Sequence, residues 1–158
     1  MRNWRIIGDP SHEHFSLDTS PFYLVAHIDH KYHEDMDKVL RKYGMTRPKY
    51  RVLHVLREHN PCNIGDLSDR AMIKKSTMSR IVERLRKEGL VKTTPNAADK
   101  RISDVALLPA GWAALEHVLM VGSRQFHRAI AGLTNKQIDT FIKTLHHVAE
   151  NLNRLPLE

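Results

Sequence analysis

Residues 63–108 read NIGDLSDRAMIKKSTMSRIVERLRKEGLVKTTPNAADKRISDVALL, and the rest of the chain is organised around this stretch. It predicts a short helix, a tight turn and a second helix of about four turns that begins near Lys75 and ends at Gly89. Strand-forming residues follow at 90–94 and 101–108, with a polar turn between them. A hairpin directly after helix, turn and helix predicts a winged helix.

The second helix has two different faces. Its apolar residues recur at three- and four-residue spacing and form a stripe that we expect to be buried: Met78, Ile81, Val82 and Leu85. Its hydrogen-bond donors gather instead near the N-terminal end: Lys74, Lys75, Ser76, Thr77, Ser79 and Arg80. An α-helix meets base edges in the DNA major groove mainly with its first turns, so this face suits a recognition helix. An ordinary amphipathic helix with a solvated basic face is the alternative, and the hairpin that follows favours the recognition helix.

The order STMSRIVERLRKEGLVK, then DKR, then a strand ending in LLPAG resembles the MarR family of transcriptional regulators. The positions that match the family pattern are Leu85, Gly89, Leu90, Val91, Asp99, Arg101, Leu107 and Gly111. Upstream, Met45-Thr46 and Val52-Leu53 also match, whereas Lys49 stands where the family usually has Gln. The resemblance implies a mainly α fold with a small β-hairpin wing, a winged helix-turn-helix flanked by long N- and C-terminal dimerisation helices.

We expect one intertwined domain, because 158 residues suffice for one real core but not comfortably for two. Its parts are an N-terminal arm at 1–19, a helical dimerisation region at 20–44 and 109–158, and the DNA-binding winged helix at 45–108. Ser20 and Thr134 are predicted helix caps. The first long helix has a predicted buried line formed by Phe22, Val25, Ile28, Tyr32, Met36, Val39 and Tyr43, and the last one by Ile138, Phe141, Ile142, Leu145, Val148, Ala149 and Leu152. This apolar surface exceeds what one small domain covers, so we expect a homodimer.

Composition restricts the partners. The formal charge of +7 favours a polyanion, although charge alone does not separate DNA from RNA or an acidic membrane surface. No apolar run approaches the ~20 residues of a membrane span, and no signal-peptide core is present. The single Cys62 excludes an intramolecular disulfide and suits a reducing cytoplasm. We interpret Cys62 as a small packing residue, with a redox switch as the alternative.

A two-fold dimer would place two recognition helices in successive major grooves, about 34 Å apart, and would read a pseudo-palindrome. Ser76, Thr77, Ser79 and Arg80 are the candidates for base edges and phosphates, with Arg80 the best candidate for guanine. Lys74, Lys75, Arg84 and Lys87 are candidates for phosphates, and Lys100 and Arg101 tip the wing. By resemblance, Arg101 reaches the minor groove and Asp99 pairs with a nearby arginine to hold the wing in shape; the alternative for Asp99 is a plain turn residue.

The resemblance also implies a small aromatic or phenolic acid between the dimer helices and the winged helix, and repression relieved by that ligand. Residues expected to line the junction are Tyr23, His27, His30, Arg51, His54 and His117. A carboxylate is recognised by a bidentate cation and an aromatic ring by Tyr or His, so nicotinate- or benzoate-like acids fit. The alternative is that Arg51 is exposed or capping and that the histidines are interface residues.

Other functions are less favoured. His27, His30, His33 and Glu34 have spacings that can share zinc, which would make a metal-responsive regulator. No Gly-rich phosphate loop, Gly-x-Ser-x-Gly or His-Glu-x-x-His motif occurs, so we expect no enzyme activity and no cofactor. A non-specific architectural DNA-binding protein is the remaining alternative.

Overall fold

A computed structural model describes residues 3–154 and shows a mainly helical chain with a small antiparallel sheet, which confirms the predicted fold class. In chain order the elements are α1 (Trp4–Ile7), the 3-10 helix η1 (Leu17–Thr19), α2 (Pro21–Lys42), α3 (Arg47–Glu58), β1 (Cys62–Asn63), α4 (Ile64–Ala71), α5 (Lys75–Lys87), β2 (Val91–Pro95), β3 (Ser103–Leu107), α6 (Pro109–Ala129) and α7 (Asn135–Arg154). They form two compact units, Met1–Gly122 and Ser123–Glu158, and we describe each by itself.

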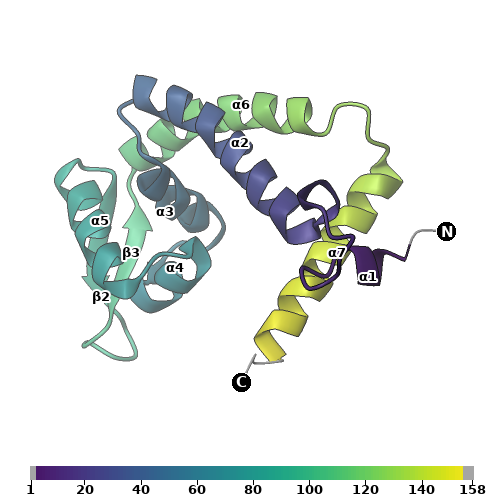
Figure 1. Ribbon diagram of the computed structural model, residues 1–158. Helices are drawn as coiled ribbons and strands as arrows, with labels where there is room; N and C mark the ends of the chain where they lie inside the picture. The colour runs from purple at the N-terminus through teal and green to yellow at the C-terminus, as the bar shows by residue number, and fades with distance from the viewer. Residues whose placement is uncertain (1–2, 155–158) are drawn as a thin grey trace. The chain divides into compact units, whose positions relative to one another are not determined.

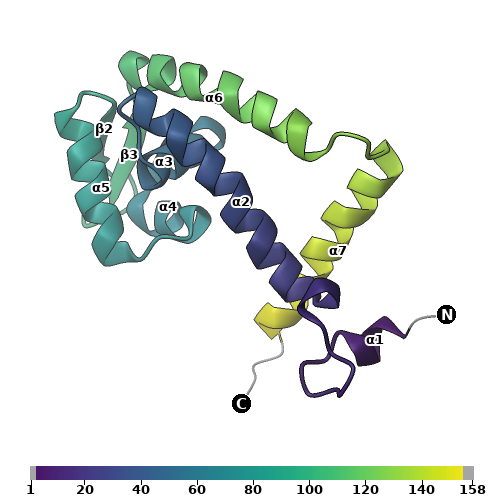
Figure 2. The ribbon, with the colours of Figure 1, turned by 45° about the horizontal axis from the view of Figure 1, so that its top comes forward.

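The first unit contains the winged helix. Its α3 packs against both α2 and α4, and α5 lies beside β2 (Figures 1 and 2). The buried core comes from these helices, the sheet and the first half of α6, and its largest fully buried side chains include Leu40, Leu53, Leu56, Leu67, Met78, Leu85, Val91, Val105, Leu115 and Val118. The apolar stripe predicted for α5 therefore meets the buried face of α3 in one core, which fixes α5 by its inner face and leaves its outer face to solvent.

The sheet has three strands in the order β1-β3-β2, all antiparallel. The sequence predicted the β2–β3 hairpin but not β1, whose two residues pair through Cys62 with Val105 and through Asn63 with Asp104. A two-residue strand leaves no periodic pattern to detect. Pro95 closes β2 opposite Ser103 and is not part of the turn, where we expected it.

Glycines mark the places where the winged helix turns tightly. Gly89 has a φ of 71° directly after α5, a left-handed conformation that glycine adopts without a Cβ clash. Gly111 lies in the first turn of α6, where an added Cβ would collide with the carbonyl oxygen of Leu90. These two positions hold the end of α5, the start of β2 and the start of α6 close together.

The N-terminal helix α2 begins as predicted, with Pro21 in its first turn and Ser20 as its cap, since the Ser20 hydroxyl accepts a hydrogen bond from the Tyr23 backbone N–H. The predicted buried line is wrong for its first half within a single chain, because Phe22, Val25 and Ile28 are exposed. Only the last turns bury side chains, namely Met36 and Leu40. Ahead of α2, the predicted N-terminal arm contains α1 and η1, neither of which buries a residue.

The second unit consists of the end of α6 and of α7. Thr134 caps α7 as predicted: its hydroxyl accepts from the Gln137 N–H, while the Gln137 side chain accepts from the Thr134 N–H, which makes a reciprocal capping box. None of the apolar positions predicted to be buried on α7 is buried in the single chain. No helix among residues 3–154 is both long and apolar enough to cross a membrane.

Candidate nucleic-acid interface

Helix α5 presents its predicted DNA-contacting residues to solvent. Met78, Val82 and Leu85 are buried on the inner face, as expected from their spacing. The predicted contacts at and near the N-terminal end are all exposed: Lys74, Lys75, Ser76, Thr77, Ser79 and Arg80. No side chain caps this end of the helix, so its first backbone N–H groups and the positive end of the helix dipole remain available to a phosphate.

The charges on α5 are distributed unevenly along its length. Among the residues that the structure describes, Lys74, Lys75 and Arg80 have no carboxylate partner, so the N-terminal half has unneutralised positive charge. Towards the C-terminal end, Glu83 pairs with Arg86 at 2.9 Å, whereas Glu88 lies 3.3 Å from Arg84 and is shared with Lys49 of α3 at 2.6 Å. A polyanion is therefore attracted most strongly to the end of the helix that carries the predicted base contacts.

The turn before α5 has an unusual residue. Met72 ends α4 with a φ of 53°, the left-handed region that a non-glycine residue rarely adopts, and its side chain is 77% exposed. Because the Met72 side chain is mostly exposed, it contributes little hydrophobic stabilisation, and the fold does not require it in the turn.

At the tip of the wing, Asp99 and Arg101 form a bidentate ion pair. The Asp99 carboxylate accepts from Arg101 Nε at 3.0 Å, from Nη2 at 2.9 Å and from the Arg101 backbone N–H at 3.0 Å. These hydrogen bonds keep the pKa of Asp99 below its usual value. The arginine that was expected to pair with Asp99 is thus Arg101 itself. Its side chain is 90% exposed and accessible to DNA, and the neighbouring Lys100 is exposed as well.

Asn96 organises the wing turn, a role that the sequence analysis missed. Its side-chain N–H group donates to both carboxylate oxygens of Asp104 at 3.0 and 2.9 Å, and its side-chain oxygen accepts from the backbone N–H groups of Ala98 and Asp99. Asn is known to bond its own backbone a few residues ahead, so its position at the start of the turn was the available signal. Asn96 therefore links the strand end to the loop that carries Arg101.

An ion pair that the sequence did not predict joins α3 to the end of α5. Lys49 is buried at 5% exposure, and its Nζ lies 2.6 Å from both carboxylate oxygens of Glu88. This hydrogen bonding from Lys49 lowers the pKa of Glu88. The departure of Lys49 from the usual Gln was the visible signal, but its partner lies 39 positions away in the sequence.

Three helices of the first unit meet at Tyr50 of α3. Its hydroxyl is hydrogen-bonded to His54 Nδ1 at 3.1 Å, and a Cβ at Gly122 of α6 would lie 3.6 Å from it. Burial, together with Tyr32 of α2, raises the pKa of Tyr50. Arg51 is half-buried one residue away and, within residues 3–154, has no carboxylate partner. Of the predicted effector residues, His54 therefore contacts Tyr50 at a junction between helices, and Arg51 is the next residue after Tyr50 on α3; the sequence did not predict Tyr50.

The remaining predicted effector residues do not join this junction in a single chain. His117 lies against Tyr43 with ring centroids 6.0 Å apart, whereas Tyr23 lies against His27 at 6.1 Å near the start of α2. Twenty residues of helix separate Tyr23 from Tyr43, or about 30 Å at 1.5 Å per residue. One small molecule therefore cannot contact both ends within one chain. His30 is likewise exposed on the first half of α2.

A separate cavity of 310 Å³ lies where α2 ends and α3 begins. None of the predicted effector residues lines it; its lining is Asp37, Arg41, Met45, Thr46, Arg47 and Pro48. Two hydrogen bonds from Arg47 to the Asp37 carboxylate cross this cavity, so the guanidinium there is already paired.

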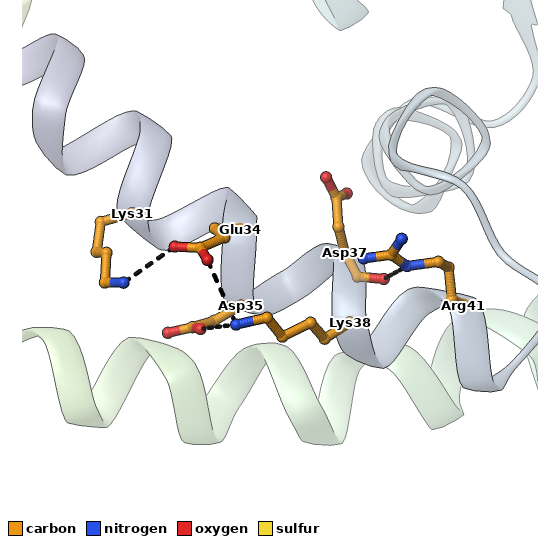
Figure 3. Close-up of polar contacts among 6 residues, drawn as sticks. All are labelled: Lys31, Glu34, Asp35, Asp37, Lys38 and Arg41. Carbon is orange, nitrogen blue, oxygen red and sulfur yellow. Dashed lines mark hydrogen bonds and ion pairs between the residues drawn. The ribbon is translucent and has the colours of Figure 1, made fainter.

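The four side chains considered for zinc are not assembled into a site. Glu34 is held between Lys31 and Lys38, at 2.9 and 3.4 Å (Figure 3). His33 Nδ1 lies 3.1 Å from Asp29 instead. Within the described part of the chain, no three His, Cys, Asp or Glu side chains come close enough together to hold a metal ion. Nothing in the geometry favours the zinc-responsive alternative.

Comparison with known proteins connects this geometry to a family. The MarR family model matches residues 43–102, which include the recognition helix and most of the wing. The transcriptional repressor IacR of Pseudomonas putida is 33% identical over 147 residues, which cover 93% of this chain and 88% of that protein.

Solved structures of similar proteins agree with this family assignment. A MarR family regulator from Silicibacter pomeroyi superposes with a TM-score of 0.80 at 26% identity, covering 90% of this chain and 94% of that one. Bordetella bronchiseptica BpsR, whose DNA binding is regulated by 6-hydroxynicotinic acid, has the same fold, with a TM-score of 0.64 at 21% identity over 80% of this chain and 98% of that one. The chain therefore belongs to the MarR family, and it is a DNA-binding transcriptional regulator and not an enzyme.

Proposed function

We propose that the protein is a homodimeric repressor that binds a pseudo-palindromic operator and is released from it by a small aromatic carboxylate, nicotinate- or benzoate-like. The observation that carries the DNA-binding part is the outer face of α5, where exposed donors and unpaired positive charge coincide at the N-terminal end. Each wing adds Arg101 and Lys100. Repression is the mode named for IacR, and it is part of the proposal here.

Dimerisation is supported by exposed apolar surface on two elements. The first half of α2 exposes Phe22, Val25 and Ile28, and α7 exposes Phe141 and Ile142, each between 43 and 61%. Monomeric soluble proteins rarely expose large apolar patches, so the apolar face of each of these two helices favours a partner. A second copy that covers these faces would relate two α5 helices by a two-fold axis and set the spacing of the two half-sites.

The effector part of the proposal concerns the junction around Tyr50. Tyr50, which is half-buried, His54 and Arg51 lie on α3, which also packs against the helix-turn-helix; among residues 3–154 the guanidinium of Arg51 has no carboxylate partner. Arg51 offers a bidentate partner for a carboxylate, and the rings of Tyr50 and His54 offer an aromatic wall. The same fold responds to a hydroxylated pyridine carboxylate in BpsR. Tyr23 and His27 belong to the proposed pocket only if they come from the partner subunit.

A competition binding assay tests the proposal. The protein is titrated against DNA from upstream of its own gene and against random DNA of the same length, with and without benzoate, nicotinate and their hydroxylated derivatives. We expect a preference of about 1,000-fold or more for the specific site and a loss of binding with at least one acid. Equal affinity for both DNAs would indicate a non-specific architectural protein, and binding unaffected by any acid would remove the effector part alone. Arg51→Ala should abolish the acid response without changing operator affinity.

A further inference from the structure

The buried ammonium group of Lys49 is the starting point. Among the residues that the structure describes, Lys49 has the only buried charged side chain, with 6% of it exposed. Removing an ammonium group from water is unfavourable unless a counter-charge lies against it. Glu88 supplies that charge, with both oxygens 2.6 Å from Nζ. Lys49 cannot touch DNA itself, because its Nζ is enclosed between α3 and the end of α5.

Glu88 occupies an unfavourable position for an anion. It is the C-cap of α5, at the negative end of the helix dipole. Without Lys49, its only cationic partner among residues 3–154 would be Arg84, which is 69% exposed. That contact is longer, 3.3 Å, and the arginine precedes the glutamate by four residues, the weaker order for a helical ion pair.

Lys49 and Arg84 therefore compete for the negative charge of Glu88. In the present arrangement Lys49 takes both carboxylate oxygens, while Arg84 holds one of them by a single longer hydrogen bond. Since the charge of Glu88 is balanced by Lys49, the charge of Arg84 is left in excess on the outer face of α5. An excess positive charge there can release a counterion when it binds a DNA phosphate.

We propose that Lys49 is a positioning residue for DNA binding: by neutralising Glu88 from inside the protein, it leaves Arg84 free to bind a phosphate of the operator. The inference rests on the proposed function, because Arg84 is one of the proposed DNA contacts. If Lys49 loses its charge, Glu88 turns to Arg84 and neutralises it. A phosphate contact is then lost although the substituted residue is buried.

The test is the salt dependence of operator binding by the full-length protein, measured as the slope of log K against log salt concentration. Each phosphate contact contributes a slope of about −0.9 on B-DNA, so the loss of Arg84 in both subunits of a dimer should flatten the slope by about 1.8. We expect this change in Arg84→Met. Lys49→Gln should produce the same change, because glutamine can still donate a hydrogen bond to Glu88 but brings no charge.

Two further variants separate charge from structure. Lys49→Arg keeps the positive charge and should keep the wild-type slope. Lys49→Gln combined with Glu88→Gln removes both charges of the pair, frees Arg84 again and should restore the wild-type slope. Circular dichroism of each variant shows whether it is folded, and the combined variant contains no uncompensated buried charge.

The outcomes are distinguishable. If Arg84→Met flattens the slope but Lys49→Gln does not, the inference is wrong and the proposed DNA contacts stand. If Lys49→Gln flattens it and the combined variant fails to restore it, the effect of Lys49 is structural and the inference is again wrong. If Arg84→Met leaves the slope unchanged, Arg84 binds no phosphate, which overturns the inference and removes Arg84 from the proposed interface.

Discussion

The winged helix and the terminal helices have the same kind of apolar pattern, but they differ in what covers it. In α3, Val52, Leu53 and Leu56 are completely buried. In α7, Phe141, Ile142 and Leu145 have the same three- and four-residue spacing and are 38–49% exposed. The periodicity of apolar residues predicts a helix and its apolar face in both regions. It does not say whether that face is covered by the same chain or by another one.

This difference separates two sources of stability. The winged helix holds its recognition helix with contacts inside one chain, so its core should tolerate the separation of two subunits. The faces of α2 and α7 gain from burial only if a partner covers them, so their contribution should depend on protein concentration. The predictions below test this distinction and the interface that it supports.

The largest effect is expected in the core. Leu53→Ala removes a fully buried side chain and should lower the free energy of unfolding by about 2–5 kcal/mol, measured by urea denaturation. The matched control is Leu145→Ala, which truncates a leucine already 38% exposed in the single chain and should act mainly on self-association. Equal losses of unfolding free energy, with no change in association for either variant, would remove the distinction between the two regions.

The next effect concerns base recognition by α5. Arg80→Ala should weaken operator binding by about 1–3 kcal/mol per half-site and should reduce the preference over random DNA, since Arg80 is the proposed guanine contact. Arg86→Ala on the same helix is the control, because two 2.9 Å hydrogen bonds already tie its guanidinium to Glu83. A larger loss of specificity for Arg86 than for Arg80 would show that the wrong face of α5 has been assigned to DNA.

A smaller effect is expected at the wing. Arg101→Ala should weaken operator binding and flatten its salt dependence, because it removes the cation at the wing tip and leaves the Asp99 carboxylate uncompensated beside the DNA. The control is Lys143→Ala, which removes one positive charge from α7, where the lysine pairs with Asp139 at 2.7 Å. Unchanged affinity of Arg101→Ala across a salt series would contradict a DNA-contacting wing.

The smallest effect is a gain in stability. Met72→Gly relieves a left-handed conformation and should raise the free energy of unfolding by about 1 kcal/mol, measured by thermal or urea denaturation. Met120→Gly makes the same substitution at another exposed methionine, 62% exposed, but within α6, where glycine should lower stability by about 1 kcal/mol. Destabilisation by both substitutions would mean that the Met72 side chain supports the fold.

Much of the fold could be predicted because its signals are local. The caps at Ser20 and Thr134 and the helix end at Gly89 each depend on a few adjacent residues, and the structure confirms all three. The two-residue strand β1 has no comparable local signal, because its pairing partner lies about forty residues further along the chain. We expected Pro95 in the turn, but it occupies the last position of β2, which is an edge strand and therefore tolerates proline.

The candidate site was predictable to the same extent. The donors at the start of α5 follow from helical geometry alone, and the structure places all of them at the surface. The pairing of Lys49 with Glu88 and the junction at Tyr50 depend on how α3 packs against other elements, which residue spacing does not encode. Packing also separates two predicted effector residues. Tyr23 lies near the start of α2, whereas His117 of α6 lies against Tyr43 at the other end of α2.

The central claim is that two copies of the chain, joined through their terminal helices, read DNA together. Sedimentation velocity at micromolar concentration tests it most directly, with Ile142→Glu placing a charge on the apolar face of α7 and Thr140→Glu placing the same charge on its polar face. We predict that the wild type and Thr140→Glu sediment as dimers, and that Ile142→Glu sediments as a folded monomer that no longer binds the operator. A wild-type protein that is monomeric and still binds the operator, or an Ile142→Glu variant that remains a dimer, would contradict this account.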